Sequence, residues 1–178
     1  MALDRAAQSV GTILLILLPD GQVVVPMVVA INHWSPKWKF PTGNVEVTEG
    51  VSEDIFSAAI REICEETGLV VDLAEIKSPR AISQVIPKEN GAHHLHILGC
   101  LITRNEKDLQ WQLRYEDKHD GKDLLHAKIF KLDEILECVA CGVPGQLATR
   151  DGTTRHGILP AHIEYFQTFW KSLDMPNR

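Results

Sequence analysis

Glu53–Leu69, which reads EDIFSAAIREICEETGL, carries the strongest structural signal in the chain. Its apolar residues recur at spacings of three and four, which is typical of an amphipathic helix, and they are Ile55, Phe56, Ala59, Ile60 and Ile63. Acidic residues near its start suit the positive end of a helix, and Gly68 suits a C-terminal exit. The stretch therefore predicts a helix over residues 52–67, capped by Ser52, whose apolar face packs on another element.

Three glutamates of this helix crowd onto one side. Glu62, Glu65 and Glu66 are spaced i, i+3 and i+4, so their carboxylates project in nearly the same direction. Each like-charged pair of this kind costs an isolated helix roughly 0.2–0.5 kcal/mol, and a hard divalent cation among the oxygens would relieve that cost. The alternative is a solvated acidic face steadied by Arg61, four residues before Glu65. The helix alone favours this alternative.

Residues on both sides of the glutamates shift the balance toward metal binding. From Glu53 to Leu69 the chain fits the spacing E-x7-R-E-U-x-E-E-x-G-U, where U is an aliphatic residue. An aromatic-Pro-x-Gly segment, Phe40-Pro41-Thr42-Gly43, opens the loop that leads into the helix. These two segments resemble the Nudix box and the segment before it. By this resemblance the chain is identified as a member of the Nudix hydrolase superfamily.

The loop between the two segments departs from the family pattern. The family places five residues between the glycine and the first glutamate, whereas nine residues separate Gly43 from Glu53. Glu49 would satisfy the short spacing, but eleven residues would then separate it from Arg61. The chain carries a four-residue insertion in either alignment. Glu53 is favoured because it keeps the helix continuous and leaves the extra length in a loop, where insertion costs little free energy.

The resemblance implies the fold, the cofactor and the roles of the helix residues. The fold would be of the α/β class, a Nudix-type α/β/α sandwich around a mixed β-sheet. Glu62, Glu65 and Glu66 would bind Mg²⁺ or Mn²⁺, and Arg61 would pair with a carboxylate to orient the helix. Glu62 and Glu66 are both candidates for the general base, and the sequence does not distinguish them.

The resemblance also implies a metal-binding carboxylate outside the box. Residues 123–129, DLLHAKI, look like the family's Glu-Ile-x-x-Ala-Lys-Trp stretch, which places Asp123 at the acidic position. Glu116, Asp117 and Asp120 compete with Asp123 for this role. For each of these residues the alternative is a solvated charged loop.

Trp38, Gly43 and Arg80 are the candidate substrate contacts. Trp38 and Gly43 belong to a loop that mixes aromatic, lysine and turn residues, a composition common in ligand walls. The indole of Trp38 could stack on a base, with core packing as the alternative. Arg80 could meet a phosphate or a ribose, with a surface charge as the alternative. His94 and His96 share one face of a predicted strand, either as pocket lining or as solvated surface.

The rest of the chain predicts a mixed α/β domain. Strands are expected at 13–18, 23–31, 81–87, 94–103 and 128–132, and helices at 133–140 and 160–173. Pro19-Asp20-Gly21 forms the turn between the first two strands, and Pro26 places part of the second at an edge or bulge. We expect one domain over residues 1–178, with a Nudix-like core at about 12–136 and a C-terminal helix at about 160–173.

Composition limits the partners of this chain. A net charge of -6 over 178 residues argues against nonspecific nucleic-acid binding, so a small-molecule nucleotide substrate would need a locally positive site. The apolar run Ile13–Leu18 is too short to cross a bilayer, and no membrane partner is expected. Four scattered cysteines and the lack of a cleavable signal favour a cytoplasmic location. The aromatic C-terminal helix fits either a core or a homodimer surface.

Hydrolysis of a diphosphate bond in a nucleoside diphosphate linked to another moiety is the leading function. The Phe40–Gly43 segment looks closest to plant-type and fibroblast-growth-factor-antisense-like members, whose substrates include ADP-ribose and NADH. The alternative is a catalytically inactive Nudix-fold module that binds a nucleotide or regulates, and the intact Arg61 and glutamates argue against it. An isoprenoid diphosphate isomerase ranks third, because Cys64 lies on the helix rather than in a pocket loop.

Overall fold

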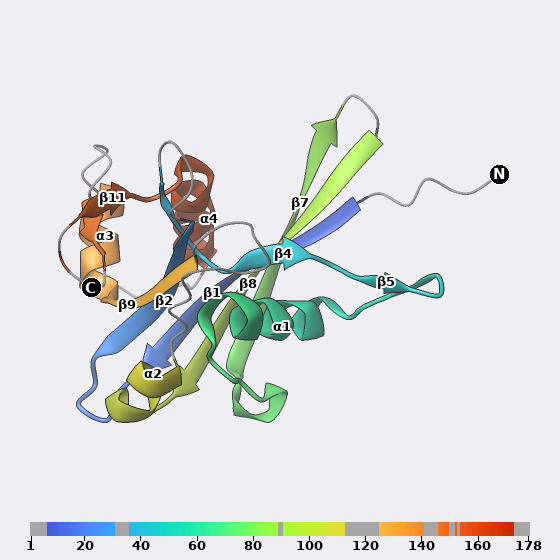
Figure 1. Cartoon of the computed structure of the whole chain (residues 1–178). Helices are drawn as coiled ribbons and strands as arrows, with labels where there is room; N and C mark the ends of the chain where they lie inside the picture. The colour runs from blue at the N-terminus through green and yellow to red at the C-terminus, as the bar shows by residue number, and fades with distance from the viewer. Residues whose placement is uncertain are drawn as a thin grey trace.

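The computed structural model describes residues 7–30, 36–88, 91–112, 125–140, 146–149, 152 and 154–172. Within this part of the chain the largest sheet has seven strands, and five of them follow the order β3-β2-β1-β8-β7 (Figure 1). β4 pairs with β1, and β9 pairs with β2. The strands are β1 (Ala7–Leu17), β2 (Val23–Ala30), β3 (Trp38–Lys39), β4 (Thr42–Asn44), β7 (Lys77–Lys88), β8 (Gly91–Thr103) and β9 (Leu125–Lys131). Each of the five predicted strands overlaps one of them.

The sheet is mixed because its two central strands run parallel. β1 and β8 pair from Ala7↔His93 to Leu17↔Thr103, whereas the other ladders of this sheet are antiparallel. Parallel neighbours require a crossover connection, and here that connection includes α1 (Ile55–Thr67). The mixed sheet that the family resemblance implied is confirmed.

Helices cover both faces of the sheet. α1 packs on one face, where Ile63 lies in one buried cluster with Leu14 of β1. On the other face lie α3 (Leu132–Ala140) and α4 (Pro160–Ser172), and Phe166 of α4 packs in one cluster with Ile13. Ile13 and Leu14 separate to opposite faces because side chains alternate along a strand. The expected α/β/α sandwich is therefore present, and Figure 1 shows α1 lying along the sheet.

The inserted residues form a short hairpin instead of an irregular loop. β5 (Val47–Thr48) pairs antiparallel with β6 (Val51–Ser52), and Glu49 and Gly50 make the turn between them. Both turn residues have positive φ, 51° and 82°, as expected for a tight two-residue turn. The hairpin projects from the sheet beyond the N-terminal end of α1 (Figure 1). The insertion thus adds a β-hairpin directly before the Nudix box helix.

The hairpin also corrects the predicted start of the helix. Ser52 belongs to β6, and Asp54 is the N-cap, accepting hydrogen bonds from two backbone N–H groups of the first turn at 3.1 and 3.0 Å. The N–H of Glu53 donates to Glu46 O at 2.8 Å and closes the hairpin, so the chain turns helical only afterwards. Gly68 ends α1 as predicted, with φ 79°.

Smaller elements complete the described chain. The predicted helices at 133–140 and 160–173 correspond to α3 and α4. Pro26 lies in β2 beyond its last pair with β1, so its missing N–H removes no hydrogen bond from that ladder. Besides the short strands β3, β4, β5 and β6, the elements that were not predicted are η1 (Leu73–Glu75), α2 (Glu106–Gln112), β10 (Gln146–Ala148) and β11 (Arg155–Gly157).

Candidate active site

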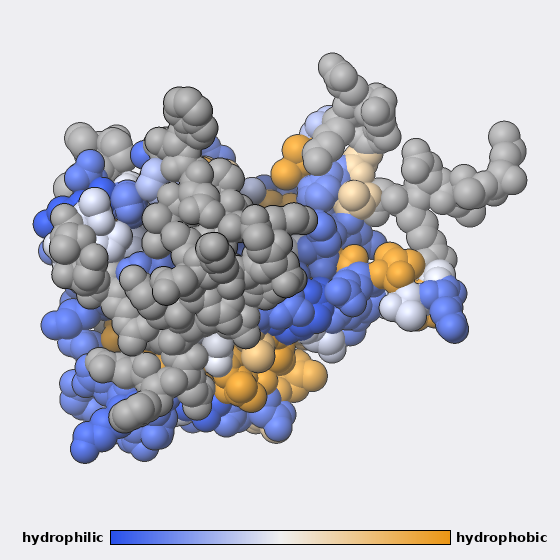
Figure 2. Space-filling view, viewed as in Figure 1, coloured by the Kyte–Doolittle hydropathy of each residue, from blue (hydrophilic) through white to orange (hydrophobic). Residues whose placement is uncertain are grey.

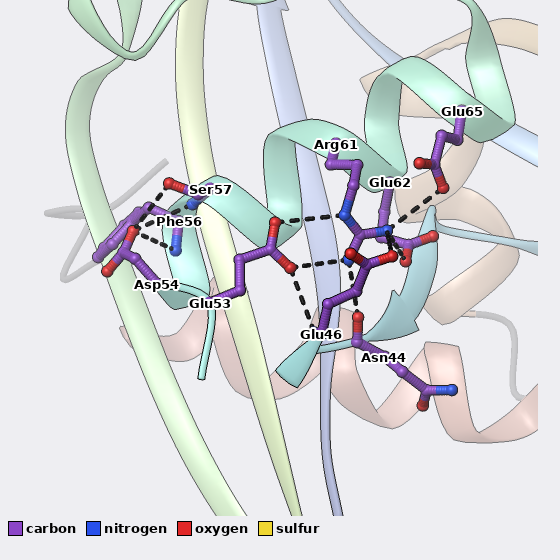
Figure 3. Close-up of polar contacts among 9 residues, drawn as sticks. All are labelled: Asn44, Glu46, Glu53, Asp54, Phe56, Ser57, Arg61, Glu62 and Glu65. Carbon is purple, nitrogen blue, oxygen red and sulfur yellow. Dashed lines mark hydrogen bonds and ion pairs between the residues drawn. The ribbon is translucent and has the colours of Figure 1, made fainter. Parts of the chain in front are cut away.

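Arg61 joins α1 to the loop that precedes it (Figure 3). Its Nε donates to Glu53 Oε1 at 3.2 Å and its Nη2 donates to Glu53 Oε2 at 2.9 Å, a bidentate pair. Nη2 also donates to the carbonyl of Asn44 at 2.8 Å. The Arg61 hydrogen bonds lower the pKa of Glu53 below its usual value. Glu53 is therefore the carboxylate that orients the helix through Arg61, whereas Glu49 lies in the hairpin turn.

Two box glutamates lie around the same guanidinium. Arg61 Nη1 donates to Glu62 Oε1 at 2.7 Å and to Glu65 Oε2 at 3.3 Å. The Glu65 side chain is 56% exposed, whereas Glu62 as a residue is only 8% exposed. Burial raises the pKa of Glu62, and the Arg61 hydrogen bond opposes that rise. Glu62 is thus a buried carboxylate held at one oxygen by a neighbouring cation.

Gly43 leaves the space that the Glu62 carboxylate fills. A Cβ built on Gly43 would lie 1.8 Å from Glu62 Cδ and 1.8 Å from Glu62 Oε1. Any side chain at position 43 would therefore displace this carboxylate. The substrate contact predicted for Gly43 stays a prediction, and the role that the structure gives this residue is to position Glu62.

Glu66 is held by Lys39 of β3 and Thr42 of β4. Lys39 Nζ donates to Glu66 Oε1 at 2.6 Å, and the backbone N–H of Thr42 donates to Glu66 Oε2 at 2.9 Å. Lys39 Nζ also lies 3.3 Å from Thr42 Oγ1. Sequence reasoning did not single out Lys39, because a lysine in a polar loop carries no spacing signal. The fold gives it a place at the carboxylate cluster.

The carboxylates offer the right chemistry for a hard cation but are engaged by protein cations. Their oxygens are the ligands that Mg²⁺ and Mn²⁺ prefer, and Glu62, Glu65 and Glu66 share one side of α1. No group of three or more His, Cys, Asp or Glu side chains in the described chain converges closely enough to hold an ion. Arg61 and Lys39 would have to move aside for a metal to bind. Asp123, the predicted fourth ligand, lies outside the described residues.

The structure places Trp38 in the core. This residue is 0% exposed, and its indole N–H donates to Leu147 O at 3.0 Å. Its ring meets Phe130 edge-on with 4.8 Å between centroids. A base cannot reach an indole buried in this way, so the stacking role expected for Trp38 is corrected to the core-packing alternative.

Arg80 lies on the far side of the sheet from the box. Its Nη1 donates to Ser172 O at 2.7 Å, at the end of α4. Because α4 and α1 pack on opposite faces, this contact directs Arg80 away from Glu62, Glu65 and Glu66. The structure does not bring Arg80 to the carboxylates, and its exposed side chain fits the surface-charge alternative.

His94 and His96 lie on one face of β8, as the alternation predicted, and both line a cavity of about 640 Å³. The cavity lies between the start of the β1–β8 pair and the inserted hairpin, since Gln8 and Val47 also line it. Of the two sequence readings for these histidines, pocket lining therefore fits the structure.

Known proteins share this fold and its sequence pattern. The NUDIX domain family model matches residues 8–149. No curated protein matches the chain. Among solved structures, the Ap4A hydrolase of C. elegans has 16% identity and a TM-score of 0.51, covering 93% of this chain and 98% of its own. The NUDIX domain of Shewanella oneidensis NrtR, complexed with ADP ribose, has 16% identity and a TM-score of 0.56, covering 97% and 91%. A NUDIX hydrolase from Nitrosomonas europaea has 17% identity and a TM-score of 0.51, covering 98% and 97%.

The structural likenesses establish the fold, and the family match covers well over half of the chain. Among the described residues, no helix has the length and apolar character needed to span a membrane. The box arginine and glutamates lie together on α1, as the spacing predicted. The chain belongs to the NUDIX domain family.

Proposed function

We propose that the chain hydrolyses a diphosphate bond in a nucleoside diphosphate linked to another moiety, with ADP-ribose or NADH-like molecules as substrates and with Mg²⁺ or Mn²⁺ as cofactor. The carrying observation is the cluster of Glu62, Glu65 and Glu66 on one side of α1, ordered by Arg61. Three like charges gathered there repel one another, and a divalent cation among their oxygens would relieve that repulsion. In this proposal the three carboxylates bind a divalent cation, and the cation binds the substrate diphosphate.

Each side chain has a defined part in this proposal. A bound Mg²⁺ or Mn²⁺ would polarise the phosphorus and lower the pKa of a water. Glu66 has both oxygens engaged, by Lys39 and by the Thr42 N–H, which suits an orienting role. Glu62 is buried and held at Oε1, so its other oxygen is the better candidate for taking the proton of the attacking water. Lys39 and Arg61 supply the local positive charge that a phosphate requires in an acidic protein.

The substrate class rests on related proteins and on the sequence resemblance. The C. elegans structure is that of an Ap4A hydrolase, and the Shewanella oneidensis domain was crystallised with ADP ribose. Those ligands belong to those proteins. They share a nucleoside joined through phosphates to a second group, and we extend that shared chemistry to this chain.

The test is a substrate panel with defined metals. Nucleotide or phosphate release is measured for ADP-ribose, NADH, diadenosine polyphosphates, nucleotide sugars and nucleoside triphosphates, with Mg²⁺, with Mn²⁺ and with chelator. Glu65→Gln and Glu66→Gln are compared with Glu137→Gln, a matched change at an exposed glutamate of α3. We expect metal-dependent cleavage of one substrate class, a loss of at least about 100-fold in kcat/KM in both box variants, and no loss in the control.

The rival is a Nudix-fold module that binds a nucleotide without cutting it. The engagement of Glu66 by Lys39 favours this rival, because a protein cation already neutralises that carboxylate. Tight nucleotide binding with no turnover in the presence of any metal would refute hydrolysis and support a nucleotide-binding module. Turnover that persists in both box variants would instead move the chemistry away from α1.

A further inference from the structure

The inserted hairpin and two strand ends line an open cavity that the carboxylate chemistry does not use. Its volume is about 640 Å³. Gln8 of β1 and His94 and His96 of β8 form one side, and Val47 of the hairpin forms the other. The hairpin carries exposed apolar side chains, with Val47 54% exposed, and Figure 2 shows an apolar patch at this end of the molecule. A hydrophobic surface beside a cavity is a common sign of a binding site.

The lining favours a flat, uncharged, polar ligand. In the described part of the cavity wall the polar groups are amides, imidazoles and a hydroxyl, and none of its side chains is an acid, a lysine or an arginine. Val45 and Val47 supply apolar contact. A phosphate would find no lysine or arginine among the described lining residues, whereas a nucleobase presents apolar faces and edges that donate and accept hydrogen bonds. Nucleobases therefore match this lining better than phosphates or acids.

One histidine of the wall is fixed and the other is available. His96 Nδ1 lies 2.8 Å from Ser83 Oγ, and His96 Nε2 lies 3.3 Å from Gln8 Oε1, so both ring nitrogens are engaged. Burial lowers the pKa of His96, which keeps its ring neutral at pH 7. No hydrogen bond joins the His94 ring to another described residue. His94 and the amide nitrogen of Gln8 are thus the groups that can hydrogen-bond to the edge of a base.

The cavity adjoins the carboxylate cluster through two loop residues. Asn44 lines the cavity, and its backbone carbonyl accepts the Arg61 hydrogen bond at 2.8 Å. At Gly43, the residue before it, the Glu62 carboxylate fills the space that a side chain would occupy. Ser52 lines the cavity from the hairpin, directly before Glu53, the partner of Arg61. A nucleoside in the cavity would therefore direct its phosphates toward the box.

We propose that this cavity is the base-binding subsite of the nucleotide substrate and that the four-residue insertion, as its outer wall, sets the base preference. The substrate class rests on the proposed function, whereas base binding does not require cleavage. His94 and Gln8 are the specificity-determining residues, and they act through contact with the base.

The experiment measures equilibrium binding of AMP, GMP, CMP and UMP in the presence of chelator, by calorimetry, with ribose 5-phosphate as the ligand that lacks a base. His94→Ala and Gln8→Ala are compared with His156→Ala, a histidine of β11 outside the cavity. Each cavity variant is expected to bind the preferred nucleotide about 5–10-fold more weakly, the loss of one hydrogen bond, with no change for ribose 5-phosphate. A variant lacking Thr48–Val51 is expected to change the order of preference among the four nucleotides.

Three results would overturn the proposal. They are equal nucleotide affinity in the cavity variants and wild type, an equal loss for ribose 5-phosphate, and no binding of any of the four nucleotides at concentrations up to about 10 mM. The outcomes for the two proposals stay separate because a mononucleotide has no diphosphate bond to hydrolyse. Base-dependent binding without turnover of the substrate panel would keep the subsite and remove hydrolysis. Turnover whose KM is unchanged in both cavity variants would keep hydrolysis and remove the subsite.

Discussion

Replacing Gly43 by alanine places a methyl group where the Glu62 carboxylate lies. The built Cβ would be 1.8 Å from Glu62 Cδ and 2.2 Å from Glu62 Oε2, so the carboxylate must leave. The backbone at Gly43 does not adopt the left-handed conformation, so alanine itself fits the local geometry. The perturbation is therefore steric and confined to one contact.

The magnitude follows from what Glu62 loses when it moves. Its hydrogen bond from Arg61 Nη1 is 2.7 Å long, and hydrogen bonds to charged groups contribute about 1.5–3 kcal/mol to stability. The lower part of that range applies because Arg61 keeps Glu53 and because burial already disfavours the Glu62 charge. Against this loss, replacing glycine by alanine stabilises by about 0.4–1 kcal/mol through the unfolded chain. We expect Gly43→Ala to lower the free energy of unfolding by about 0.5–1.5 kcal/mol.

A double-mutant cycle isolates the contact. The free energy of unfolding is measured in urea for wild type, Gly43→Ala, Glu62→Ala and the double variant. With Glu62 shortened, the methyl group has room, and Gly43→Ala should become neutral or stabilising by up to about 1 kcal/mol. The coupling between the two sites should then be about 2 kcal/mol. Equal costs in both backgrounds would refute the reasoning, because the methyl group would then be meeting something other than Glu62.

Three further predictions concern buried or engaged groups. Burial and the charge of Lys39 lower the pKa of His162 from 6.5 to about 4, so the unfolded state binds the proton first. The free energy of unfolding should therefore fall by up to about 3 kcal/mol as the pH is lowered from 6.5 to about 4. In urea titrations over this pH range, His162→Gln should show a smaller fall than wild type. Lys39→Met removes the cation from Glu66 and should tighten Mn²⁺ binding about 2–5-fold by calorimetry, whereas weaker binding would show that Lys39 supports the metal. Burial raises the pKa of Cys100 to about 11, so a thiol reagent should label the partly exposed Cys64 before Cys100, and mass spectrometry after tryptic digestion would reveal the opposite order.

The box could be read from the sequence because its information is local. Arg61, Glu62, Glu65 and Glu66 lie within two turns of one helix, and helical spacing alone fixes their common side. Glu53 could be chosen over Glu49 for a related reason, since it keeps the helix continuous. The structure places Glu53 on Arg61 at 2.9 Å.

The sequence predictions were wrong at residues whose placement depends on tertiary contacts. Ser52 is a reasonable cap by residue type, but the hairpin takes it as a strand residue and leaves the cap to Asp54. Trp38 and Lys39 are adjacent on β3, and strand alternation sends them to opposite faces. One therefore enters the core and the other reaches Glu66. Sequence alone did not reveal which neighbour faced the site, because the loop before β3 shows no period.

The parallel pairing of β1 with β8 has a consequence for how the chain is made. Each paired residue of β8 comes 86 positions after its β1 partner, since 93 − 7 and 103 − 17 both equal 86. During synthesis, the side of β1 that will meet β8 must stay unpaired until that later segment has left the ribosome. Non-local pairing of this kind slows folding and exposes an apolar strand to other chains in the meantime. Expression at lower temperature, or with a chaperone that holds extended apolar segments, should therefore raise the yield of folded protein more than any change at the carboxylate helix.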